Sequence, residues 1–220
     1  GDATYFKLDG SSASGGTLYT QFPDNSNLTF GSADDLQIKH DGTDSKITNS
    51  TGDLVIRNLA DDKDIIFQSD DGSGGVETYF YLDGSASSGD PYTVWPDNSI
   101  AAWGTDVDLR IQHDGSTASI FNTTGHLQII NYADDKDIIF KSDDGSGGVE
   151  TYFFLDGSIS SGNPFTVFPD NSHLAFGDSQ DLQIDHDGNH SVIYNKTGHL
   201  YISNDYNDGD IILRSDDGSG

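Results

Sequence analysis

The stretch "DLQIKHDGTDSKITNSTGDLVI", residues 35–56, sets the plan of the whole chain. Apolar and polar residues alternate in it, as in Leu36-Gln37-Ile38, and each alternating run ends at a polar residue. A period of two is typical of a β-strand with one covered face, because successive side chains point to opposite faces. Turn residues separate the runs, and Asp41-Gly42 is a pair that favours a tight hairpin. The stretch therefore predicts a meander of short antiparallel strands.

The same stretch returns from Asp108 and again from Asp181. The segment "FPDN" at 22–25 recurs as "WPDN" at 95–98 and as "FPDN" at 168–171. A fixed period of this kind indicates a repeat architecture. We divide the chain into three repeats of about 73 residues, namely 1–74, 75–147 and 148–220. Since Gly1 aligns with Gly75 and Gly148, we expect the sequence to be a window of a longer array.

About seven segments of each repeat have strand character, and none has a helical period of 3.6 residues. In the first repeat they are "TYFKL", "TLYTQF", "NLTF", Leu36–His40, Ser45–Asn49, Leu54–Asn58 and Ile65–Ser69. The predicted fold class is all-β. The alternation predicts that Leu36, Ile38, Ile47, Leu54, Ile56, Ile65 and Phe67 face inward. It places Gln37, Lys46, Thr48 and Arg57 toward water.

A one-sided meander cannot stand alone, because its apolar face must be covered. The preferred architecture is an elongated fibre in which three chains each present one sheet to a common axis, as a trimeric β-prism or β-helix. A single-chain β-solenoid is the alternative. The expected partner is therefore a copy of the same chain, in a homotrimer or a filament.

The composition restricts the other partners. The formal net charge is −27, from 37 acidic and 10 basic residues, so the surface repels phosphate backbones and anionic membranes. No apolar run approaches the ~18 residues of a membrane span. Nucleic acid binding and membrane insertion are therefore not expected, while host-surface glycans and cations remain open. The absence of cysteine excludes disulfides and thiolate metal sites.

Histidine, aspartate and serine lie close together after each "HDG" motif, at His40, His113 and His186. Such a group resembles catalytic or metal-binding machinery, but a catalytic centre needs distinct groups converging from separate parts of the chain. Identical groups recur here, so a histidine that closes a strand and bonds to the next turn is the favoured interpretation. With no catalytic motif in the chain, we expect no enzymatic activity.

Two kinds of acidic loop suggest calcium, which prefers hard oxygen ligands. One is "SDDGSG", and the other is "DDKD" at 61–64 and 134–137, which becomes "NDGD" at 207–210. The candidate ligands in the first are Asp70, Asp71, Asp143, Asp144, Asp216 and Asp217. Solvated acidic turns are the alternative, and no cofactor is required by the pattern.

Asn49, Asn122 and Asn195 each begin an N-glycosylation acceptor pattern. The alternative interpretation, which we favour, is that Asn, Thr and Gly are the turn residues that this hairpin needs.

The unusual spacing D-L-x-I-x-H-D-G, in 35–56 and its two copies, resembles repeats of structural and tail-fibre-like proteins of marine bacteriophages, especially cyanophages. The resemblance covers about 30 residues of each repeat and carries over no catalytic residue. It implies a structural fibre shaft, on a virion or in the extracellular space, that projects an adhesive or receptor-binding region. A carbohydrate-binding or carbohydrate-processing spike and a calcium-stabilised bacterial surface adhesin are the alternatives.

Overall fold

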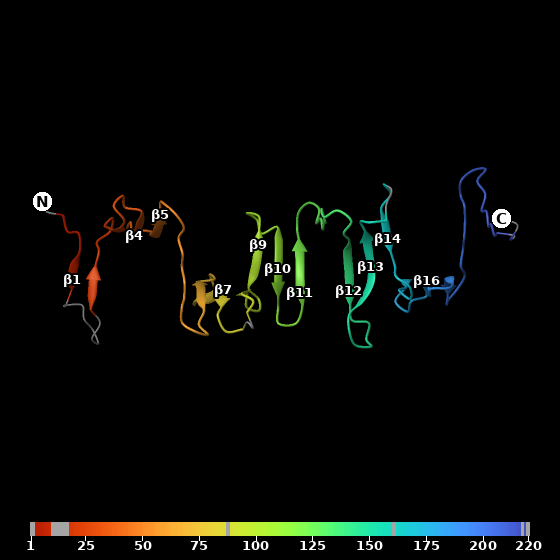
Figure 1. The fold of residues 1–220 in the computed structure, drawn as a ribbon, viewed down its shortest axis with the longest axis horizontal. Helices are drawn as coiled ribbons and strands as arrows, with labels where there is room; N and C mark the ends of the chain where they lie inside the picture. Colours follow the sequence, from red (N-terminus) through yellow and green to blue (C-terminus); the bar gives the residue numbers. More distant parts are fainter. Residues whose placement is uncertain (1–2, 10–17, 87–88, 160–161, 217, 219–220) are drawn as a thin grey trace. The chain divides into compact units, whose positions relative to one another are not determined.

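The computed structural model describes residues 3–9, 18–86, 89–159, 162–216 and 218. These residues form 17 strands and contain no helix (Figure 1). The prediction of an all-β chain is therefore confirmed. The chain divides into two units, Gly1–Gly125 and His126–Gly220, and each is described by itself.

The first unit holds antiparallel sheets made of consecutive strands. The pair β1 (Lys7–Asp9) and β2 (Tyr19–Gln21) comes first. Three sheets of three strands follow: β3 (Asn27–Phe30), β4 (Leu36–His40) and β5 (Ser45–Asn49); β6 (Ile65–Ser69), β7 (Glu77–Asp83) and β8 (Tyr92–Val94); β9 (Ile100–Trp103), β10 (Leu109–His113) and β11 (Ala118–Asn122).

The second unit holds two sheets of the same construction. One contains β12 (Ile138–Ser142), β13 (Glu150–Asp156) and β14 (Phe165–Val167); the other contains β15 (Leu174–Phe176), β16 (Leu182–His186) and β17 (Ser191–Asn195). In both units the middle strand of the chain order is also the middle strand of the sheet, so each three-stranded sheet is a simple meander.

Two kinds of three-stranded sheet alternate along the chain. The sheets β3-β4-β5, β9-β10-β11 and β15-β16-β17 contain the "HDG" hairpin, and we call them the HDG sheets. The sheets β6-β7-β8 and β12-β13-β14 carry stacked aromatic rings, and we call them the aromatic sheets. Each aromatic sheet has a register shift at the same place, between Phe67 and Gln68 or between Phe140 and Lys141. The sequence period is thus repeated in strand register.

Strand register places the apolar residues of an HDG sheet on one face. Leu28 lies opposite Ile38, and Ile38 lies opposite Ile47. Gln37 and Thr48 pair on the other face. Because side chains alternate along a strand, Leu36 shares the face of Ile38. This confirms that Leu36, Ile38 and Ile47 lie together and that Gln37, Lys46 and Thr48 lie together.

The connections to the HDG sheets depend on residues that accept a left-handed backbone. In the "PDN" turn, Asn25 has φ 63° and its N–H donates to the carbonyl of His40 at 2.8 Å. Asn98 and Asn171 repeat this bond, to His113 and His186. Asparagine tolerates a positive φ better than most residues, which explains why this turn uses it. The turn therefore fixes the first strand of each HDG sheet beside its hairpin.

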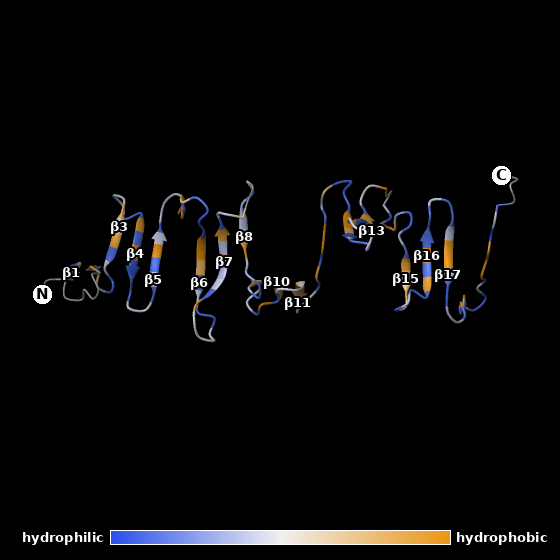
Figure 2. Cartoon of the chain, turned by 90° about the horizontal axis from the view of Figure 1, so that it is seen from below, coloured by the Kyte–Doolittle hydropathy of each residue, from blue (hydrophilic) through white to orange (hydrophobic). Residues whose placement is uncertain are grey.

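The segment 54–58 was expected to be a strand, and the structure corrects this expectation. It is not assigned to any sheet, and the equivalent segments 127–131 and 200–204 are unpaired as well. We call these three the extended segments. Figure 2 shows apolar residues along them, in the connections that follow β5, β11 and β17. The alternating pattern was interpreted correctly as extended backbone, but no partner strand pairs with it in the described part of the chain.

None of the residues that the structure describes is buried. The apolar faces of the sheets and the extended segments are all at least partly open to solvent. Ordering the backbone costs ~1–2 kcal/mol of conformational entropy per residue, and a folded domain normally offsets this cost by burying apolar side chains. The described residues of this chain provide no such core.

Candidate self-association surface

The apolar face of the first HDG sheet is open to solvent. Leu28 is 37% exposed, Ile38 is 42% exposed and Ile47 is 60% exposed. The second HDG sheet has Ala101, Ile111 and Ile120 in the equivalent places, and the third has Leu174, Ile184 and Ile193. A contiguous apolar face of this kind marks an interaction site in a soluble protein.

Each aromatic sheet carries a row of three rings that crosses its strands. The ring centroids of Phe67 and Phe80 lie 4.6 Å apart, and those of Phe80 and Trp95 lie 5.6 Å apart. The row recurs in β12-β13-β14, where the two distances are 4.5 Å and 5.7 Å. Rings at these separations attract each other and present a broad apolar platform.

Sequence analysis missed these aromatic rows. Phe80 lies in the repeated "TYF" segment and Trp95 precedes the "PDN" turn, so an aromatic residue stands at both places in every repeat. That recurrence was the available signal. The rings meet only because β7 lies between β6 and β8, and strand order cannot be taken from the spacing of single residues.

The accessible area gives the scale of what is uncovered. The chain exposes 18173 Å². Two compact units of the sizes of Gly1–Gly125 and His126–Gly220 would together expose ~12,000 Å². The difference is about 6,000 Å², whereas a protein–protein interface of standard size hides ~1,600 Å² in total. One ordinary contact therefore accounts for only a small part of the excess.

The extended segments add unpaired backbone to the uncovered side chains. In 54–58, Leu54 is 50% exposed and Ile56 is 63% exposed. Asn58 ends the segment, and its Nδ2 donates to the carbonyl of Asp64 at 3.0 Å. Asn131 and Asn204 donate in the same way to Asp137 and Asp210. The ends of these segments are therefore fixed, while the apolar residues before them have no partner strand among the described residues.

The three "HDG" histidines each bond to a residue across the hairpin or in a neighbouring turn, in agreement with the interpretation of a histidine that closes a strand. His40 Nδ1 lies 3.1 Å from the hydroxyl of Ser45, and His186 Nδ1 lies 3.0 Å from that of Ser191. His113 Nδ1 instead lies 2.9 Å from a carboxylate oxygen of Asp97, in the preceding "WPDN" turn. Among the described residues, no group of three or more His, Asp or Glu side chains is placed to hold a metal ion.

The aspartates proposed as calcium ligands close glycine-rich turns. Asp70 Oδ1 accepts the N–H of Gly72 at 2.6 Å, and Asp71 Oδ1 accepts the N–H of Ser73 at 2.8 Å and its hydroxyl at 2.6 Å. The two bonds from Ser73 lower the pKa of Asp71, and the bond from the Ser73 hydroxyl is the largest cause.

The later copies repeat this arrangement. Asp143 and Asp144 make the same bonds to Gly145 and Ser146, and Asp216 accepts the N–H of Gly218. Asp217 lies outside the described residues. Calcium binding by these loops stays a prediction.

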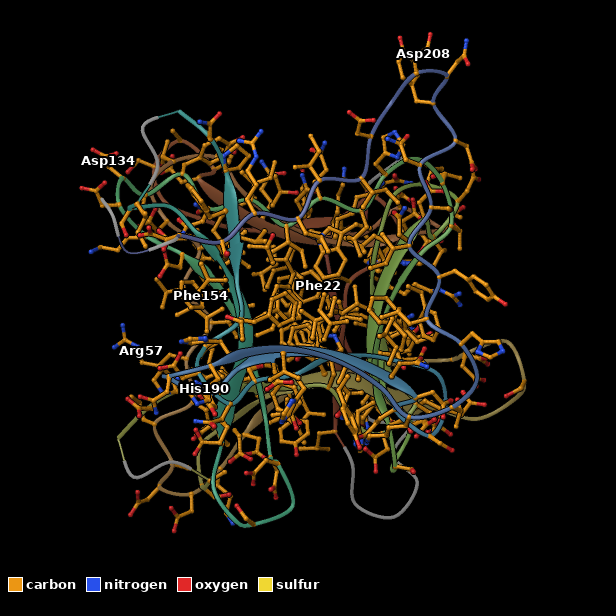
Figure 3. All side chains as sticks on the ribbon, turned by 90° about the vertical axis from the view of Figure 1, so that its right-hand side faces the viewer. Phe22, Arg57, Asp134, Phe154, His190 and Asp208 are labelled. Carbon is orange, nitrogen blue, oxygen red and sulfur yellow. The ribbon has the colours of Figure 1, made fainter. Side chains whose placement is uncertain are left out.

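The second kind of acidic loop has a different role in the backbone. Asp64 Oδ1 accepts the N–H of Gly84 at 3.0 Å, and Asp137 accepts that of Gly157 at the same distance. The end of the loop 61–64 is thereby fixed beside the end of β7, and the end of the loop 134–137 beside the end of β13. Figure 3 shows Asp134 and Asp208 at the tips of their turns, with side chains that point away from the ribbon.

The three acceptor asparagines use their side-chain nitrogen in the turn that they begin. Asn49 Nδ2, the atom that would carry a glycan, donates to the carbonyls of Thr51 and Gly52 at 2.8 and 2.9 Å. Asn122 and Asn195 make the same pair of bonds. This supports the interpretation of these residues as turn formers.

No family model, no curated protein and no solved structure matches the chain. Its described residues contain no helix with the length and hydrophobicity of a membrane span.

Proposed function

We propose that this chain is a structural segment of a fibre, built by the association of several copies and acting as a shaft that projects an adhesive region. The observation that carries the proposal is the lack of a core, since none of the described residues is buried. The regular alternation of apolar and polar residues shows that the apolar residues on one face of each strand are meant to be covered. The partner that offers a matching surface at every repeat is another copy of the same chain.

A homotrimer is the proposed assembly, with the apolar faces and aromatic rows of three chains turned toward one another as a β-prism. The strand pairs favour it over a single-chain β-solenoid. A solenoid stacks successive coils as parallel strands, whereas all strand pairs among the described residues are antiparallel and join consecutive strands. A meander in each chain leaves the faces free for other chains.

The shaft function follows from what the repeats share. Specific recognition normally uses irregular loops that differ from their surroundings. Here the turns after Asp41, Asn49 and Asp70 recur with the same hydrogen bonds in the next repeat. Equivalent units can be added without redesign, which suits a spacer on a virion or in the extracellular space. The resemblance to phage fibre repeats supports the same proposal.

A carbohydrate-binding spike is the second candidate, and the aromatic rows favour it, because stacked rings at an open surface suit a sugar face. The two candidates make opposite predictions for the rings. In the shaft they are covered by other copies, and in the spike they remain exposed in the native assembly.

The test is binding by the 220-residue segment, measured on glycan arrays and on candidate host cells, with Phe80→Ala and Phe153→Ala as variants. A shaft shows no saturable binding, and both variants lower its melting temperature. Saturable glycan binding that Phe80→Ala abolishes while the melting temperature is unchanged would contradict the shaft and support the spike.

A further inference from the structure

The turn that precedes each extended segment is bonded to the start of the middle HDG strand, and the chain after it does not pair with its own sheet. Four residues, 50–53, separate β5 from the extended segment 54–58, as four residues separate β4 from β5. The same hairpin would therefore be possible by length. Instead, the Ser50 N–H donates to the carbonyl of Asp35 at 2.7 Å, and the Thr51 hydroxyl donates to the carboxylate of Asp35 at 3.2 Å. These bonds anchor the turn on the β4 side of the sheet.

The same anchor occurs in the other repeats. Thr123 N–H donates to the Asp108 carbonyl at 2.9 Å, and Lys196 N–H donates to the Asp181 carbonyl at 2.7 Å. A bond pattern present three times is a property of the repeat. In each repeat it leaves two groups without partners in the described chain: the outer edge of the third HDG strand and the extended segment that follows it.

These two unpaired elements match each other. Strand β5 and the segment 54–58 both have five residues, with an apolar residue in the middle and asparagine at the end. An open strand edge is a template for another chain, and extended segments commonly bind such edges. Each copy thus offers one edge and one segment per repeat.

Charge also favours this contact. In a chain with 37 acidic residues, the third HDG strands and the extended segments contain neither Asp nor Glu. Two copies that each carry a net charge of −27 repel each other, so contact is least opposed where both surfaces lack carboxylates. The strands and segments that fulfil this condition are 45–49, 118–122, 191–195, 54–58, 127–131 and 200–204.

We infer that each extended segment pairs with the outer edge of the third HDG strand of a neighbouring copy, so that the copies of the assembly exchange strands. This inference rests on the proposed self-association and adds the contact through which it occurs. Because every copy gives a segment to one neighbour and accepts one from the other, the contact is head-to-tail, and in the proposed trimer it closes as a ring. The apolar face of each HDG sheet thereby gains a fourth strand.

The turn length predicts the register. Across the first turn, Ile38 lies opposite Ile47. A segment exchanged between copies takes the register that a four-residue turn would give within one chain, which places Ile56 opposite Ile47 and Val55 opposite Thr48 of the neighbouring copy. Lys46 would face Arg57 in this register, but its ammonium is already paired with the Asp41 carboxylate at 2.6 Å.

The test uses the absence of cysteine from the chain. Chains with Thr48→Cys and chains with Val55→Cys are unfolded together, refolded and oxidised, and disulfide-linked pairs are identified by mass. The control replaces the first variant with Gln37→Cys, which shares the face of Thr48 on the neighbouring strand β4. Strand β4 lies ~4.8 Å further from the segment than β5 does. The Cα atoms of residues 37 and 55 would therefore be ~10 Å apart, beyond the ~7 Å that a disulfide spans between Cα atoms.

We expect about tenfold more mixed dimer from the first pair than from the control, because only the first pair fulfils that distance. Equal yields from the two pairs would overturn the inference. Hydrogen exchange of the unmodified chain provides the second measurement, and the amides of Leu54 and Ile56, which face the edge of β5 in this register, should be protected in the assembly. A multi-chain mass without protection there would overturn this contact alone, whereas a single-chain mass would overturn the proposed self-association as well.

Discussion

Asp41, Asp114 and Asp187 close the "HDG" hairpin by accepting backbone hydrogen bonds. In the second repeat, Asp114 Oδ1 accepts the N–H groups of Ser116 and Thr117 at 2.9 and 2.8 Å. The Thr117 N–H is the largest cause of the lowered pKa of Asp114. A carboxylate bonded in this way stabilises the folded hairpin, because the unfolded chain lacks the bonds.

The role of Asp114 can be tested by substitution at two pH values. Asp114→Ala should lower the melting temperature at neutral pH by more than Asp114→Asn, because asparagine keeps the acceptor oxygen. A lowered pKa in the folded state means that the stabilisation is present above the unfolded pKa of ~3.9 and is lost as the pH falls below it. The difference between the wild type and Asp114→Asn should therefore shrink in acid. A difference that is unchanged by acid would contradict the role of the ionised carboxylate.

Calcium binding is also a property of single residues, and it can be separated from general screening. A net charge of −27 means that any divalent ion stabilises the fold at low ionic strength. If the loops at Asp70-Asp71 and Asp143-Asp144 bind calcium, its chloride should raise the melting temperature more than magnesium chloride at the same ionic strength. Asp71→Asn with Asp144→Asn should remove the excess. Equal effects of the two salts on the wild type would contradict specific binding.

At the scale of the element, the face on which a strand residue lies decides what a charge does there. Ile47 and Thr48 are neighbours in β5 and lie on opposite faces. In the proposed assembly the face of Ile47 is covered, so Ile47→Asp should cost several kcal/mol, about 3 or more per chain, through a buried unpaired charge.

Thr29→Asp is the matched control, because Thr29 lies on the other face of the same sheet, opposite Gln37, and outside the strands of the proposed contact. It should change the free energy of unfolding by less than about 0.5 kcal/mol, as is usual for exposed positions. Both are measured by thermal unfolding together with the mass in solution. Equal melting temperatures for the two variants would show that the apolar face of β5 is not covered.

The two tryptophans report on the apolar faces directly. Trp95 is 44% exposed in the chain and ends an aromatic row, and Trp103 is 52% exposed on an HDG sheet. If other copies cover the two tryptophans, their fluorescence emission should shift to shorter wavelengths and be quenched less by acrylamide. Dilution below the dissociation concentration should reverse both changes. Fully quenchable emission at every concentration would contradict the cover.

The sequence allowed some elements to be predicted and not others. Leu36–His40, Ser45–Asn49 and Ile65–Ser69 were predicted with the bounds found for β4, β5 and β6, because alternation and turn residues act locally. Residues 54–58 carry the same alternation but pair with no described strand. Alternation shows that one face is to be covered, and it does not identify which chain supplies the partner.

The candidate surface was predictable to the same degree. The common face of Ile38 and Ile47 followed from the period of two. The row of Phe67, Phe80 and Trp95 did not, because it depends on strand order and on the register shift beside Phe67. The turn anchor at Asp35 also lay outside the reach of sequence analysis, since it joins residues 15 or more positions apart.

At the scale of the whole molecule, we propose that the chain is folded only with other copies of itself. An uncovered excess of about 6,000 Å² is larger than the ~2,000–5,000 Å² of many obligate interfaces, so the proposed contacts between copies are extensive. Dissociation and unfolding should then be one event, as in obligate oligomers.

The most direct test of that claim is the mass of the 220-residue chain in solution, measured by sedimentation equilibrium over a range of concentrations while circular dichroism records the β-structure. We expect a mass of three times 23.7 kDa for the folded trimer, with loss of β-structure on dissociation. A species of 23.7 kDa that keeps its β-structure and unfolds cooperatively at a concentration-independent temperature would contradict it.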